Sequence, residues 1–149
     1  MRLRLIVLAS ALALASVATA SSALGATAGA RPTLTVRSSQ FGKILFDGRG
    51  FALYAFTRDR RGGASTCYGA CAKSWPPYLV RGALGAAIGT KRSLLGSVRR
   101  RDGSLQVTYA RRPLYFYVGD RKPGQVLCQN VSEFGGLWLV VRGSGQLVR

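Results

Sequence analysis

An internal duplication is the feature that most constrains the fold of this 149-residue chain. Sliding the sequence over itself by 61 positions aligns glycine, apolar, aromatic, aspartate and cysteine positions without a gap. The aligned pairs are Gly42/Gly103, Ile44/Leu105, Phe46/Val107, Leu53/Leu114, Tyr54/Tyr115, Phe56/Tyr117, Asp59/Asp120 and Cys67/Cys128. A fixed offset of this kind indicates two copies of one supersecondary unit, each too small to be stable alone.

Each copy contains the pattern Tyr-x-aromatic-x-x-Asp, formed by Tyr54, Phe56 and Asp59 in the first copy and by Tyr115, Tyr117 and Asp120 in the second. Residues two apart on a strand project from one face, so both aromatic side chains of a copy should point to the same side. The aspartate then falls just beyond the strand end, where it can bond turn amides. The motif is therefore either structural or, if the two aspartates meet across an approximate twofold axis, a cation or two-carboxylate hydrolase site.

Short runs rich in β-branched and aromatic residues predict an all-β fold. The expected strands are 34–37, 43–46, 51–56, 105–109, 114–118 and 137–141, with hairpin turns at Asp47-Gly48 and Asp102-Gly103. Short helical turns are expected at 67–73, ended by Pro76 and Pro77, and at 91–95. We predict two pseudo-equivalent antiparallel units of about four strands each, packed into one small domain over residues 33–149. The repeats would span about 33–80 and about 94–141.

The N-terminus predicts export. Two arginines precede an apolar run at 5–18 and a small-residue cleavage site at Ala20, which is the order of a signal peptide over residues 1–20. Cleavage after Ala28 fits equally well. The apolar run is shorter than the ~20 residues that span a bilayer, so no transmembrane helix is expected in the mature protein. Residues 21–32 read as a flexible tether, and no cysteine directly follows the apolar run, so the product should be secreted or in the cell envelope and unlipidated.

The charge is strongly positive, with 22 Lys+Arg against 5 Asp+Glu. Removing residues 1–20 leaves 20 basic residues and a charge of about +15. The candidates for binding polyanions are Arg58, Arg60, Arg61, Arg99, Arg100, Arg101, Arg111 and Arg112. Outside the cell their counterparts would be anionic wall polymers or lipid head groups, and we do not expect nucleic acid because no recognition motif is present.

Histidine is missing from the chain, which excludes Ser-His-Asp and Cys-His nucleophiles and histidine-based zinc sites. The three cysteines form no complete metal set, so neither a metal nor a cofactor is expected. Cys67 and Cys71 are four apart, and on a helix their Cα atoms would lie about 6 Å apart, within disulfide range. In an oxidising compartment we predict a Cys67–Cys71 bridge that adds little stability; the pairing of Cys128 stays open.

Several blocks together resemble the bacterial secreted-repeat proteins, many of them predicted lipoproteins, that carry a Tyr-x-(Phe/Trp/Tyr)-x-x-Asp motif. The blocks are 53–59, 67–77, 106–109, 113–115, 119–120 and 133–138. The resemblance implies no established activity, although some members are loosely associated with alkane catabolism. This chain departs from the family in lacking a lipobox cysteine and in having Cys128 where a small residue is expected.

Composition and resemblance together favour a non-catalytic binding module for anionic envelope components. The alternative is an enzyme or redox protein that uses Asp59 and Asp120 or Cys67 and Cys71. Nothing in the sequence pairs a nucleophile with a base, so an enzyme is the weaker interpretation.

Overall fold

The computed structural model describes residues 33–86 and 88–149, and the expected signal peptide and tether lie outside these ranges. Short strands dominate it, which confirms the all-β prediction. In chain order the elements are β1 (Thr33–Ser39), β2 (Gly42–Asp47), β3 (Tyr54–Phe56), α1 (Ala70–Ser74), β4 (Leu79–Val80), β5 (Gly85–Ala86), the 3-10 turn η1 (Arg92–Leu94), β6 (Leu95–Arg99), β7 (Leu105–Tyr109), β8 (Arg112–Pro113), β9 (Val131–Glu133) and β10 (Gly136–Val140). No helix within the described ranges is long and apolar enough to cross a membrane.

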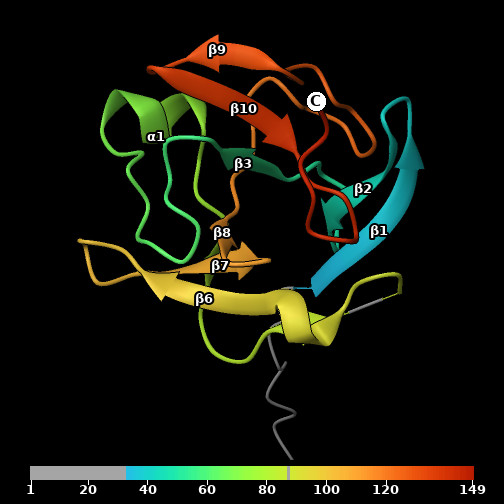
Figure 1. The fold of residues 1–149 in the computed structure, drawn as a ribbon, viewed down its shortest axis with the longest axis horizontal. Coiled ribbons are helices and arrows are strands. Elements are labelled where there is room, and N and C mark those ends of the chain that lie inside the picture. The colour runs from blue at the N-terminus through green and yellow to red at the C-terminus, as the bar shows by residue number, and fades with distance from the viewer. Residues whose placement is uncertain (1–32, 87) are drawn as a thin grey trace, which may run out of the picture.

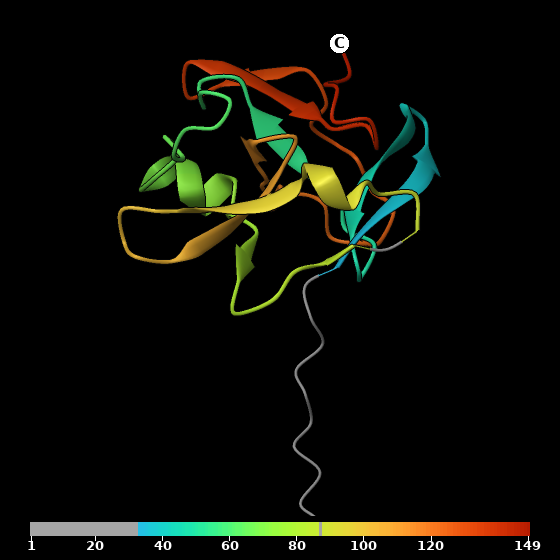
Figure 2. The same cartoon turned by 60° about the horizontal axis from the view of Figure 1, so that its bottom comes forward.

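The strands form three small sheets, in the orders β2-β1-β5, β3-β10-β9 and β4-β7-β6, with β8 added to β7. Figure 1 places β9 and β10 at one end of the molecule and β6 and β7 at the other, with β3 and β8 between them. The β1–β2 hairpin lies on the opposite side of the molecule from α1, and the turned view in Figure 2 keeps that arrangement.

The two repeats share sheets instead of forming two self-contained units. Strand β3 of the first repeat pairs with β10 of the second, with Trp138 opposite Phe56 and Val140 opposite Tyr54. Strand β4 of the first repeat likewise pairs with β7 of the second. The β3–β10 and β4–β7 ladders therefore form only when both repeats are folded together.

The expected strand at 114–118 is reduced to isolated bridges from Tyr115 to Tyr54 and to Pro77. Prolines have no backbone N–H to donate, so a regular ladder cannot form against Pro76 and Pro77. The 114–118 segment compensates by donating, with the Phe116 amide bonded to the Pro76 carbonyl at 2.8 Å. The expected strand at 51–56 is also shorter, because residues up to 53 pair with β2 and those from 54 pair elsewhere.

Two apolar clusters fill the interior. One is largely aromatic and contains both motif tyrosines, both tryptophans and the bridged cysteines. The other is mainly aliphatic and lies among β1, β2, β7 and the 114–116 segment. The motif side chains therefore belong to the core, where each ring removes on the order of 150–250 Å² from water.

Candidate functional site: the paired motif and the basic surface

The two copies of the motif exchange partners. The Tyr54 hydroxyl donates to Asp120 Oδ2 at 2.6 Å, and the Tyr115 hydroxyl donates to Asp59 Oδ2 at 2.5 Å. Each tyrosine therefore bonds the aspartate of the other repeat, 66 or 56 residues away in the chain. The backbones of the two tyrosines also pair directly, each amide donating to the other carbonyl at 2.9 Å. This reciprocal pattern marks an approximate twofold axis between Tyr54 and Tyr115.

The second oxygen of each aspartate closes a loop in its own repeat. Asp59 Oδ1 accepts from the Thr66 amide at 2.7 Å, and Asp120 Oδ1 accepts from the Leu127 amide at 2.9 Å. Thr66 and Leu127 are themselves 61 residues apart, so the two loops are equivalent. Each carboxylate thus joins the loop that follows it to the tyrosine of the other repeat, and neither leaves an oxygen without a donor.

Burial sets the proton affinity of these groups. The side chains of Tyr54 and Tyr115 are fully buried, and desolvation, followed by the adjacent aspartate, raises the pKa of both hydroxyls. Burial also raises the pKa of Asp120, although the Tyr54 hydroxyl and the Leu127 amide act in the opposite direction. The protonated phenol is therefore the form that the fold stabilises, which suits a hydrogen-bond donor to a carboxylate.

Four further aromatic rings surround this pair with the same symmetry. Trp75 and Trp138 stack face to face, with centroids 4.0 Å apart. Phe56 stacks on Trp138 at 4.2 Å, and its counterpart Tyr117 lies on Trp75 at 4.7 Å. The motif tyrosines meet the tryptophans edge-on, Tyr54 against Trp75 and Tyr115 against Trp138, at 5.2 and 5.1 Å. Trp75 and Trp138 are thus equivalent residues, 63 and not 61 positions apart.

For that reason the predicted offset of 61 residues did not align the two tryptophans. The second repeat is longer by two residues after Cys128, so a gapless offset of 61 places Trp75 on Gly136. Allowing a two-residue insertion would have aligned the only two tryptophans of the chain. That signal was available in the sequence.

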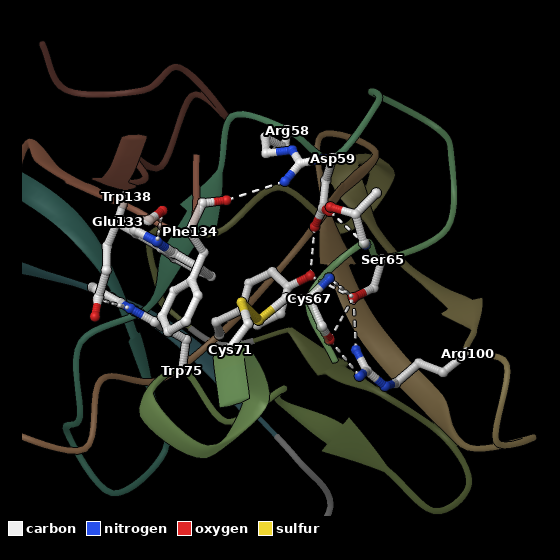
Figure 3. The surroundings of a disulfide bond; sticks show 12 residues. Arg58, Asp59, Ser65, Cys67, Cys71, Trp75, Arg100, Glu133, Phe134 and Trp138 are labelled. Carbon is white, nitrogen blue, oxygen red and sulfur yellow. Dashed lines mark hydrogen bonds between the residues drawn. A yellow bond between two sulfur atoms is a disulfide. The ribbon is translucent and has the colours of Figure 1, made fainter. Parts of the chain in front are cut away.

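The disulfide between Cys67 and Cys71 is present, as predicted, with Cα atoms 5.3 Å apart. Cys67 precedes α1 instead of lying on it, so the spacing arises from the turn that leads into the helix. Figure 3 shows the bridge beside Trp75 and Phe134, with Arg100 pointing toward Cys67 from the other side. Cys128 carries a free, half-buried thiol, and its hydrogen bond to Tyr117 raises the pKa of that tyrosine.

Arg100 is a correction to the predicted polyanion-binding set, because its side chain is buried, with 4% exposure. Its guanidinium donates to Ser65 Oγ at 2.7 Å, to Gln106 Oε1 at 2.7 Å and to the Cys67 carbonyl at 2.8 Å. Ser65 in turn contacts the Tyr115 hydroxyl at 2.7 Å. Arg100 therefore supports the first motif loop from inside the fold and cannot present its charge to a polymer.

The other seven arginines of the set are at least partly accessible: Arg58, Arg60, Arg61, Arg99, Arg101 and Arg111 are exposed, and Arg112 is half-buried. Arg101 lies over the ring of Tyr68, 4.0 Å from its centroid. Arg61 and Arg112, together with Arg149, line a depression of about 380 Å³. The predicted set thus divides between the 58–61 loop, the tip of the β6–β7 hairpin and the β7–β8 turn.

Within the described ranges no group of three histidine, cysteine, aspartate or glutamate side chains is placed to hold a metal ion.

Comparison with protein families shows which family this chain belongs to. A family model described as a secreted repeat of unknown function matches the chain at residues 35–78 and again at 96–142. The chain belongs to this secreted-repeat family. Each match contains one copy of the Tyr-x-aromatic-x-x-Asp motif and one of the two stacked tryptophans, so the resemblance drawn from the sequence is confirmed. Searches of curated proteins and of solved structures found no significant match.

For this secreted-repeat protein, the structure assigns a clear position to each element that the two matches share. The tyrosine and the aspartate hold one repeat to the other, and the tryptophans stack at the axis between them. The segment at 79–95 that the family model does not cover carries β4, β5 and η1.

Proposed function

We propose that this exported secreted-repeat protein is a non-catalytic module of the cell envelope that binds anionic wall polymers through its exposed arginines and lysines. The observation that carries the proposal is uncompensated positive charge. Three of the 22 basic residues lie outside the described ranges, which leaves 19 against all five acidic residues. Ion pairs within those ranges engage only Arg49 and Arg100.

The acidic side chains are used inside the fold or in local turns, so they do little to neutralise the surface. Asp59 and Asp120 are buried in the exchanged motif. Glu133 accepts a bond from the Trp75 indole at 2.7 Å, and Asp47 is buried and paired with Arg49. The Asp102 side chain bonds within its own hairpin turn, where the hydrogen bond from the Ser104 hydroxyl lowers its pKa. A field of one sign over the surface attracts polyanions and accelerates their association.

A wall polymer fits this surface better than a membrane does. Proteins that lie on a lipid surface combine basic residues with apolar side chains that insert between the head groups. The large exposed apolar side chains are Leu79, Ile88, Val118 and Leu127. None of the four lies in the segments 58–62, 99–102 and 110–112 that carry the exposed candidate arginines. A flexible, solvated chain of phosphates requires no such insertion.

The enzymatic alternative has less support. Both aspartates commit both carboxylate oxygens to bonds within the fold. The Cys67–Cys71 pair is closed, and Cys67 and Cys71 are buried. None of these four residues lines the depressions at 61/112/144–147/149, at 39–40/124–127 and at 62–63/96–98/108/111.

The test is calorimetric titration of the protein, residues 21–149, with poly(glycerol phosphate) at about 50, 100 and 150 mM salt. We expect measurable binding at the lowest salt and a linear fall of log K with log salt, since each neutralised phosphate releases condensed counterions. Neutral dextran is the control and should not bind. Absence of binding at about 50 mM salt, or binding that is insensitive to salt, would contradict the proposal.

Vesicles of phosphatidylglycerol, compared with vesicles of phosphatidylcholine, test the membrane alternative. We expect weaker binding to the anionic vesicles than to the polymer when the concentrations of phosphate are matched. Stronger binding to the vesicles would replace the wall polymer with the lipid surface as the partner.

A further inference from the structure

We infer that the depression lined by Arg61, Arg112 and Arg149 is a site for one phosphate group of the anionic polymer; the inference rests on the function proposed above. The remaining lining is Ser144, Gly145, Gln146 and Leu147. Arg61, Arg112 and Arg149 are three of the seven residues that line a hollow of about 380 Å³, and none of the other four carries an ionisable side chain. Arginine is the side chain best suited to paired hydrogen bonds with phosphate oxygens.

The positive charges of Arg61, Arg112 and Arg149 interact with one another. Arg112 is half-buried, and its pKa is lowered first by burial and then by the positive charges of Arg61 and Arg149. Like charges that remain together in a fold repel each other, and a bound anion relieves that repulsion. The same crowding therefore favours a phosphate group over a neutral ligand in this position.

One side-chain and one backbone hydrogen bond join the two segments that carry Arg61 and Arg112. The β7–β8 turn has positive φ at both Ala110 (50°) and Arg111 (64°), a geometry that usually requires asparagine and glycine. The 61–62 loop is hydrogen-bonded to this turn. Arg61 Nε donates to the Ala110 carbonyl at 3.0 Å, and the Gly62 amide donates to the Arg111 carbonyl at 2.7 Å. A strained turn held in this way places Arg112 beside Arg61 before any ligand arrives.

The third wall of the depression is the turn that follows β10. The Gly145 amide donates to the Arg142 carbonyl at 2.8 Å, and Gly145 has φ of 86°. A Cβ atom on Gly145 would lie 2.4 Å from the Cβ of Ala110, so this turn packs directly against the β7–β8 turn. The depression is thus framed by two turns and one loop that contact one another, which gives it a defined shape.

The first experiment compares two double variants of equal charge. Arg61→Gln with Arg112→Gln removes two cations of the depression, and Arg81→Gln with Arg121→Gln removes two exposed cations outside it. Each is titrated with poly(glycerol phosphate) at about 100 mM salt. We expect the first double variant to bind about tenfold more weakly than the second, as loss of charge-assisted bonds to phosphate predicts. Equal losses in both variants would overturn this site and leave the general polyanion proposal standing.

The second experiment does not depend on a variant that folds. Titration of the unmodified protein with glycerol 1-phosphate, followed by amide NMR, should shift the signals of Ser144, Gly145 and Gln146 most. Shifts that are spread evenly over the surface would overturn the site. If the protein fails to bind the polymer at all, the proposed function falls first, and the site falls with it.

A third arm separates two sources of the same chemistry. The Arg61/Arg112 variant should lose binding to poly(glycerol phosphate) in greater proportion than binding to phosphatidylglycerol vesicles. The reverse order would assign the depression to a lipid phosphate and overturn its assignment to a wall polymer.

Discussion

The exchange of partners between the repeats can be tested by a double-mutant cycle on Tyr54 and Asp120. Tyr54→Phe removes only the hydroxyl that donates to Asp120 Oδ2 at 2.6 Å. Asp120→Ala removes that bond and also the bond from the Leu127 amide. The Leu127 bond is lost with or without the tyrosine hydroxyl, so it cancels in the cycle and leaves the Tyr54–Asp120 term.

The magnitude follows from the burial of both groups. Tyr54 is fully buried and Asp120 is 6% exposed, so water cannot replace either partner freely. Hydrogen bonds to charged groups contribute about 1.5–3 kcal/mol, and part of that is recovered by relaxation in the variant. We therefore expect each single variant to lose about 2 kcal/mol and the coupling energy to be about 1–2 kcal/mol.

The assay is urea unfolding of the parent, the two single variants and the double variant. A matched cycle on Tyr54 and Asp59, which belong to the same repeat and whose side chains bond different residues, should give coupling within about 0.5 kcal/mol. If the same-repeat pair is coupled and the Tyr54–Asp120 pair is not, the exchange of partners is refuted.

Three further outcomes follow from buried or constrained groups. Arg100→Gln should lower the free energy of unfolding by about 2–3 kcal/mol, and Arg99→Gln by less than about 0.5 kcal/mol, in thermal melts. The raised pKa of Tyr54 means that the folded chain holds that proton more tightly than the unfolded chain, so stability is full below about pH 10 and falls as pH rises above it; urea titrations should show a smaller fall for Tyr54→Phe. Reducing the Cys67–Cys71 bridge should cost about 2 kcal/mol or less, because its loop is short.

The duplication was visible because its constraints are local in sequence. Tyr and Asp positions at a constant offset are required by equivalent hydrogen bonds and loops in the two repeats, and the structure places Thr66 and Leu127 at the same offset. The Cys67–Cys71 bridge was likewise predictable, since four residues of compact chain leave few other distances between the two sulfurs. Tyr54 and Phe56 of β3 also lie in one apolar cluster, as alternation along a strand requires.

Other features depend on which segments meet in three dimensions, and no spacing in the chain determines that. An offset aligns Tyr54 with Tyr115 but does not say whether each bonds the aspartate of its own repeat or of the other. Arg100 sits in a run of three arginines that look alike in sequence. It is buried because Ser65, Cys67 and Gln106, from two other segments, offer oxygens at the place where its side chain lies.

The claim that each repeat requires the other is tested most directly by producing the two halves separately, as residues 33–90 and 91–149. Amide NMR spectra would be recorded for each half alone and for their equimolar mixture. Each half alone lacks the aspartate that its tyrosine bonds, the tryptophan that stacks on its own tryptophan, and a strand that pairs with one of its own. For the separate halves we predict poorly dispersed amide signals, which are typical of unfolded chains. A dispersed spectrum with cooperative unfolding from either half alone would contradict the account.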